Sequence, residues 1–178
     1  MTNYAIYMSD TILNDLHIAA QDGNVDAIAR LVAAGADVNA RDAKGNTPLK
    51  YACAEPSLAA LCKLIELGAD VKLGDDRGFT PLHCIAGHGF YTEALAMAEA
   101  LLVRGADVNA RSREFGFVPL HEATGAEMIR LLVARGADVT VRSNSNQTPW
   151  EYMIEDERMD DAKALAMCAP SATNRKSG

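Results

Sequence analysis

The chain has 178 residues, of which 49% are apolar and 23% charged, and its formal net charge is −7. This composition is ordinary for a soluble globular protein, and the acidity disfavours sequence-independent nucleic-acid binding, which needs a positive surface. No run approaches the ~20 apolar residues of a membrane-spanning helix, and the first residues do not form a secretory signal, so we expect a cytoplasmic protein with no membrane and no nucleic-acid partner.

Two short phrases repeat along the chain after residues 1–10, which we expect to be an N-terminal extension. The phrase Gly-Ala-Asp-Val begins at Gly35, Gly68, Gly105 and Gly136, and each copy is followed by Thr-Pro-Leu or a variant of it, beginning at Thr47, Thr80, Val118 and Thr148. A fixed internal period predicts a stack of like units instead of one closed core. Such stacks mainly offer extended surfaces to partners.

The phrases contain the chemistry of helix ends. Thr47 and Thr80 are suited to cap a helix N-terminus, and the proline that follows fits the first helical position, where a missing N–H costs nothing. Each Gly of the other phrase is suited to end a helix in a left-handed conformation. Apolar residues at helical spacing, as in Val25, Ile28 and Leu31, predict a second helix in each unit.

These phrases resemble the ankyrin repeat, a unit of about 33 residues with a β-turn and two antiparallel helices. The resemblance implies an all-α solenoid of about five units with projecting β-turns, whose terminal units act as caps. We expect a single domain over residues 11–168, divided at about 11–43, 44–76, 77–114, 115–144 and 145–168. Residues 169–178 have too little apolar content to order themselves and are expected to be a disordered tail.

The period fails at three places. Measured from the aligned Leu to the next Gly-Ala-Asp, the third unit carries four extra residues, which must lengthen a helix or bulge the hairpin. The fourth unit lacks three residues, and the turn before it carries one extra. Two junctions also depart from the pattern, because Lys50 replaces the usual histidine and Val118 replaces threonine. We expect these two junctions to be weaker or differently fastened.

Most residues of chemical interest have a structural explanation. By the resemblance, His17, His83 and His121 fasten the turn-to-helix junctions through hydrogen bonds. Cys53, Cys62, Cys84 and Cys168 form no CxxC pair and are expected to be reduced thiols. No motif for phosphate, dinucleotide, zinc or nucleophilic catalysis occurs. We therefore expect no enzyme activity, no cofactor and no metal.

The resemblance implies that a protein partner binds at the concave side, through turn tips and first helices. Of the residues at such positions and in the third unit's insertion, we expect the partner to contact the following: Lys44, Asn46, Asp76, Arg77, Phe79, His88, Phe90, Tyr91, Arg111, Arg113, Phe115, Phe117, Asn144 and Asn146. For His88 the alternative is an exposed hairpin residue. For Phe115 and Phe117 the alternative is that a ring folds back onto the neighbouring unit. Aromatic side chains are common in binding hot spots, which favours contact.

The sequence therefore predicts a non-catalytic protein-binding module, monomeric when free. An alternative within this class is a dedicated inhibitor or immunity-type protein that neutralises one toxin or enzyme, because the repeats account for nearly the whole chain. An enzyme is the remote alternative.

Overall fold

The computed structural model describes residues 15–169, in which helices alternate with turns and no strand occurs. A helical segment over residues 15–21 is followed by α2 (Val25–Ala33), α3 (Pro48–Ala54), α4 (Leu58–Glu66), α5 (Pro81–Ala86), α6 (Ala94–Val103), α7 (Pro119–Glu122), α8 (Ala126–Ala134), α9 (Pro149–Glu155) and α10 (Met159–Cys168). The predicted all-α stack is confirmed. The expected extension at residues 1–10 lies outside the described residues, as does the expected tail except for Ala169.

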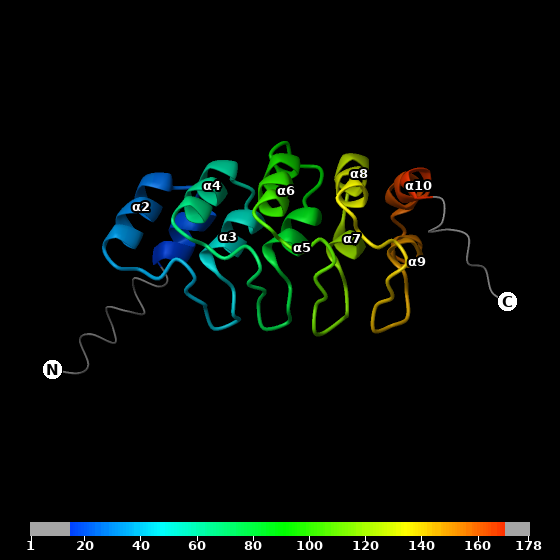
Figure 1. Ribbon diagram of the computed structural model, residues 1–178, viewed down its shortest axis with the longest axis horizontal. Helices are drawn as coiled ribbons and strands as arrows, with labels where there is room; N and C mark the ends of the chain where they lie inside the picture. Colours follow the sequence, from blue (N-terminus) through cyan, green and yellow to red (C-terminus); the bar gives the residue numbers. More distant parts are fainter. Residues whose placement is uncertain (1–14, 170–178) are drawn as a thin grey trace.

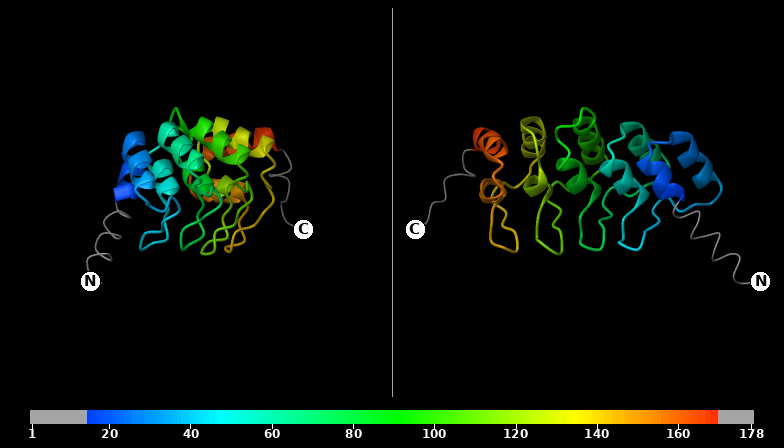
Figure 2. Two further views of the ribbon diagram at one scale, coloured as in Figure 1. Left: turned by 60° about the vertical axis from the view of Figure 1, so that its left-hand side comes forward. Right: turned by 180° about the vertical axis from the view of Figure 1, so that it is seen from behind.

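The helices form two layers along one row (Figure 1). Helices α3, α5, α7 and α9 contact one another in sequence as the inner layer. The outer layer runs from α2 through α4, α6 and α8 to α10. Long turns project from the inner layer to one side, and all three views show them side by side (Figures 1 and 2). The inner helices and these turns therefore border one continuous face.

The core lies between the two layers and runs the length of the row. The leucine of each repeated phrase, as at Leu49, Leu82 and Leu120, is fully buried. The outer helices bury Ile28, Leu61, Met97 and other apolar residues at helical spacing. Each unit buries its apolar side against the next one, so no unit holds a closed core of its own.

The helix ends are built as the phrases predict. Gly35, Gly68, Gly105 and Gly136 have φ values of 99°, 97°, 87° and 91°. At the first of these, the N–H of Ala36 donates to the carbonyl of Leu31 at 3.0 Å and that of Gly35 to Val32 at 3.0 Å, which is a Schellman motif. The hydroxyl of Thr80 accepts from the N–H of His83 at 3.4 Å and caps α5.

The extra residues of the third unit enlarge a loop instead of lengthening a helix substantially. The chain between α5 and α6 runs from Gly87 to Glu93, whereas α3 and α4 are separated only by Glu55–Ser57. In Figure 1 it is the green loop at the top of the molecule. Phe90 and Tyr91 on this loop are 79% and 57% exposed.

The missing residues of the fourth unit are removed from its inner helix. Helix α7 has four residues, whereas α3 has seven. The side chain of Arg158, from the last unit, donates to the carbonyls of His121 and Ala123 at the C-terminal end of α7. Asp161 holds this guanidinium at 3.1 Å and also accepts from the N–H of Gly125 at 2.9 Å. The last unit thus completes the hydrogen bonding of the shortened one.

Replacing Val118 with threonine should stabilise the protein. Val118 makes no side-chain hydrogen bond at the N-terminus of α7, whereas Thr80 caps α5 and also contacts the ring of its histidine at 2.9 Å. His121 stands where His83 stands, so the new hydroxyl finds the same partners. We expect the free energy of unfolding in urea to rise by about 1 kcal/mol. A loss of stability would show that the two junctions are not equivalent.

Candidate functional site: the concave groove

Each projecting turn is organised by one polar side chain near its start. Asp42 accepts from the backbone N–H groups of Lys44 and Asn46, both at 2.8 Å, and these bonds help to lower its pKa to about 2 against the opposing effect of burial. Asp75 accepts in the same way from Arg77 at 3.0 Å and Phe79 at 2.9 Å. Ser112 and Ser143 take this role in the later turns. The turns are therefore preformed without a ligand.

Neighbouring turns also bind one another. The N–H of Asp76 donates to the carbonyl of Lys44 at 3.1 Å, and that of Arg113 to Arg77 at 2.7 Å. The N–H of Asn144 donates to the carbonyl of Phe115 at 2.8 Å. These backbone bonds hold the tips at a fixed spacing, so the surface that they present is rigid.

Three histidines each fasten one inner helical segment to the next turn. The Nε2–H groups of His17, His83 and His121 donate to the carbonyls of Asn46, Phe117 and Gln147 at 3.0, 3.0 and 3.1 Å. In His83 and His121, Nδ1 accepts a backbone N–H at 3.2 Å, which fixes the neutral tautomer. Burial lowers the pKa of His83 from 6.5 to about 4 and lowers that of His121. The structural role expected of these histidines is supported.

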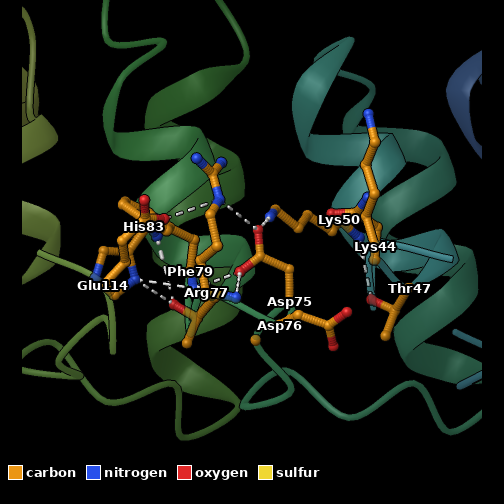
Figure 3. A network of polar contacts seen from close by, with 12 residues as sticks. Lys44, Thr47, Lys50, Asp75, Asp76, Arg77, Phe79, His83 and Glu114 are labelled. Carbon is orange, nitrogen blue, oxygen red and sulfur yellow. Dashed lines mark hydrogen bonds and ion pairs between the residues drawn. The ribbon is translucent and has the colours of Figure 1, made fainter. Parts of the chain in front are cut away.

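Lys50 fastens its junction by an ion pair instead of a histidine bond. Its ammonium contacts the buried carboxylate of Asp75 (Figure 3). The Oδ2 atom of this carboxylate also lies 3.9 Å from Nε of Arg77. Arg77 lies 3.7 Å from Glu114 on the next turn. Hydrogen bonds and Lys50 lower the pKa of Asp75, although burial, the largest influence, acts in the opposite direction. This junction is therefore differently fastened, as the sequence predicts.

The inner helices and the turns enclose an open groove of about 650 Å³. It extends from the second unit to the last, and its lining residues are Lys50, Arg77, Phe79, His83, Cys84, Gly87, His88, Phe115, Phe117, Glu122, Ser145, Gln147 and Tyr152. A second hollow beside it is lined by Ala43, Lys44, Asn46, Lys50, Asp75, Asp76 and Arg77. Both hollows lie on the face expected to bind a partner.

A row of aromatic rings crosses the groove. The ring centroid of Phe115 lies 6.2 Å from that of Phe79 and 5.5 Å from that of Phe117. Phe117 in turn stacks on His121 at 4.9 Å and contacts Tyr152 at 4.7 Å. The guanidinium of Arg77 lies 5.2 Å from the centroid of Phe79, within the range of a cation–π interaction.

Of the two phenylalanines of the third tip, one faces solvent and the other folds back onto the stack. Phe115 is 41% exposed, whereas Phe117 is 9% exposed and packs onto the fourth and fifth units. For Phe117 the alternative holds, because its ring folds back onto His121 and onto Tyr152 of the neighbouring unit. Phe115 stays the candidate hot spot.

The groove brings together five of the predicted residues: Arg77, Phe79, His88, Phe115 and Phe117. Lys44, Asn46 and Asp76 line the second hollow with Arg77. The structure shows that Phe90 and Tyr91 lie outside both. The side chains of Arg111 and Asn144 bind neighbouring backbone carbonyls at 2.9 and 3.0 Å. Arg113 and Asn146 are exposed on the tips.

His88 lies just beyond the C-terminal end of α5 and is partly buried. Its Nδ1 lies 2.8 Å from the carbonyl oxygen of Cys84, and its ring meets that of Tyr91 edge-on at 5.3 Å. Both contacts orient the ring at the edge of the groove. His88 therefore keeps both a structural contact and a position where a partner can reach it.

Sequence reasoning missed Glu122 and Tyr152, which also line the groove. Both directly follow the repeat position that holds His17, His83 and His121. Ile18, Tyr51 and Cys84 occupy the same position in their own units. Aligning this column would have identified them. Tyr152 lies in the last unit, which the sequence predicts to be a cap.

The cysteine that lines this groove, Cys84, is not a reactive thiol. Burial raises the pKa of Cys84 to about 11, so its thiol is not activated. Residues 15–169 contain no cluster of three histidine, cysteine or acidic side chains able to hold a metal ion. In the same range, no helix has the length and apolar character needed to cross a membrane.

Comparison with known proteins agrees with this architecture. Two family models match, one described as ankyrin repeats in many copies, over residues 16–65, and one as ankyrin repeats in three copies, over residues 57–143.

Three curated proteins illustrate the similarity. The chain is 29% identical over 82% of its length to tyrosine-protein kinase HTK16 of Hydra vulgaris, and 33% identical over 87% to ankyrin repeat protein FPV232 of Fowlpox virus. It is 33% identical over 76% of its length to NF-kappa-B inhibitor alpha of Gallus gallus. These alignments span only 15%, 32% and 44% of the three relatives' own lengths.

The neutral histidines should make stability depend on mild acid. The pKa of His83 is about 4 in the folded chain and 6.5 for the unperturbed group, so below pH 6.5 the unfolded state binds a proton that the folded state does not. Linkage then predicts that His83 removes about 2 kcal/mol from the free energy of unfolding between pH 7.5 and pH 5. Urea unfolding at both values measures this loss. In His83→Gln the loss should be smaller, and an unchanged loss would contradict the assignment.

The two phenylalanines should differ sharply in their effect on stability. Phe117→Ala removes a buried ring and should lower the free energy of unfolding by about 3–5 kcal/mol. Phe115→Ala alters an exposed side chain and should change it by about 0.5 kcal/mol or less. Thermal and urea unfolding monitored by circular dichroism compare the two. Equal losses would show that Phe115 belongs to the core as well.

Proposed function

The chain belongs to the ankyrin repeat family, whose repeats are a protein–protein interaction module, and from this premise we propose that its concave groove binds one protein partner without catalysis. The observation that carries the proposal is the groove itself, with the exposed ring of Phe115 standing in it. An exposed aromatic side chain beside the buried ring of Phe117 is suited to become a binding hot spot.

The rigidity of the surface supports this proposal. The tips are organised by Asp42, Asp75, Ser112 and Ser143, and backbone hydrogen bonds join each tip to the next. A preformed surface loses little conformational freedom when a partner docks. The binding set that we propose comprises Arg77, Phe79, His88 and Phe115 in the groove, with Lys44, Asn46 and Asp76 in the adjoining hollow.

A narrower role as an inhibitor is the second candidate. It is favoured by the alignment with NF-kappa-B inhibitor alpha, a relative whose name states inhibition. In this version the chain covers a functional surface of its partner and neutralises it. We further propose a cytoplasmic location and a monomeric free state.

A comparison of variants tests the proposal. The wild-type chain, Phe115→Ala and Val103→Ala are immobilised and exposed to a lysate of the source cells, and captured proteins are identified by mass spectrometry. Val103 is the matched control, because it is an apolar residue of the outer layer that is 75% exposed. Wild type and Val103→Ala should retain one protein that Phe115→Ala loses.

The inhibitor version has its own readout. If the captured protein is an enzyme or toxin, adding the chain in equal amount should abolish its activity. Capture that survives Phe115→Ala would place binding outside the groove. Several unrelated partners with unaltered activities would contradict the inhibitor role.

A further inference from the structure

One acidic side chain of the groove differs from every other residue at its repeat position. The position directly after that of the junction histidines holds Ile18, Tyr51, Cys84, Glu122 and Tyr152 in the successive units. Only Glu122 among them is an acid. Glu122 lies on α7 and lines the groove together with Tyr152, Phe115 and Phe117.

Glu122 is also the one charged group lining the groove that lacks a counterpart among residues 15–169. Lys50 contacts Asp75, and Arg77 lies 3.9 Å from Asp75 and 3.7 Å from Glu114. Within the described range, no hydrogen bond or ion pair reaches the carboxylate of Glu122. The nearby guanidinium of Arg158 is engaged by Asp161 and by two backbone carbonyls.

The environment of Glu122 is that of an acid that has lost water without gaining a hydrogen bond or an ion pair within the described residues. The residue is partly buried, and burial is the largest influence on its pKa, which is raised. The positive charges of Arg158 and Arg77 act to lower this pKa and the negative charge of Asp156 acts to raise it, and burial outweighs the two cations. Such a carboxylate favours a cation that arrives from outside.

The aromatic residues that line the groove with Glu122 favour a guanidinium over an ammonium. Aromatic rings attract a guanidinium through their faces, and in this groove Arg77 already lies over Phe79 at 5.2 Å. Tyr152 and Phe115 offer further rings on the same lining. A guanidinium is planar, weakly hydrated and able to bind a carboxylate with two donors, which an ammonium cannot match.

We propose that Glu122 is the anchor for an arginine of the protein partner, which enters the groove, pairs with this carboxylate and lies against the rings of Tyr152 and Phe115. The inference rests on the proposed function, because it names the chemistry that the groove recognises. The acidic net charge of the chain, −7, favours the approach of a basic segment.

The proposal has a consequence for the free protein. A partly buried carboxylate without a partner costs stability until the ligand arrives. Glu122→Gln should therefore raise the thermal midpoint of the free chain and weaken binding at the same time. Glu127→Gln serves as the control, since Glu127 is an exposed carboxylate of α8 that contacts Arg130.

Random peptides displayed on phage provide the probe. Peptides are selected on the wild-type chain, synthesised, and measured by calorimetry against the wild type, Phe115→Ala, Glu122→Gln and Glu127→Gln. We expect groove-binding peptides to carry an arginine and to lose affinity by about tenfold or more with Glu122→Gln. Glu127→Gln should leave their affinity unchanged. Replacing the peptide arginine by citrulline should match the loss with Glu122→Gln, and replacing it by lysine should give an intermediate loss.

The outcomes separate this inference from the proposed function. If all groove-binding peptides lose affinity with Phe115→Ala and keep it with Glu122→Gln, the arginine anchor is overturned and the groove stays the binding site. Equal affinity for arginine and citrulline peptides would overturn the anchor in the same way. If no selected peptide is sensitive to Phe115→Ala, the groove itself is not the binding site, and the proposed function fails with it.

Discussion

A hydrogen bond from each inner helix to the turn of the following unit sets the shape of the concave face. It runs from the Nε2–H group of a histidine to a backbone carbonyl at 3.0–3.1 Å in three junctions. The same ring receives a backbone N–H of its own unit in two of them, so one imidazole joins two turns and a helix. Apolar packing between units supplies most of the stability, but it is not directional. These bonds fix the positions of the tips, and the groove depends on those positions.

The irregular units show how the stack tolerates departures from its period. The shortened α7 leaves two carbonyls that Arg158 satisfies. The insertion between α5 and α6 forms a loop at the edge of the stack, where it does not disturb the contacts between layers. The departures therefore alter the groove and its border while the core continues across them.

Much of the fold could be predicted from the sequence, because its determinants are local and repeated. The helix-ending glycines, the threonine caps and the junction histidines lie where the two phrases place them. The candidate site was predicted less well. Whether Phe115 or Phe117 faces solvent depends on contacts that only the folded stack reveals, since Phe117 stacks on His121 and packs against Tyr152 of the last unit. Glu122 was not among the predicted site residues. Its acidic character stands out only when it is aligned with the residues at the same repeat position in the other units.

The Lys50–Asp75 pair makes the two ends of the second unit depend on each other. At the other junctions the residue in the place of Asp75 is Asp42, Ser112 or Ser143, opposite a histidine that needs only a backbone carbonyl. Lys50 and Asp75 both lie within residues 44–76, so a copy of this whole unit would carry the ion pair with it. A recombination point between the two residues that joined Lys50 to a later turn would instead set the lysine against a serine and leave its charge without an acid. The second unit can therefore be exchanged only as one segment, whereas a junction made by histidine accepts any turn that offers a backbone carbonyl.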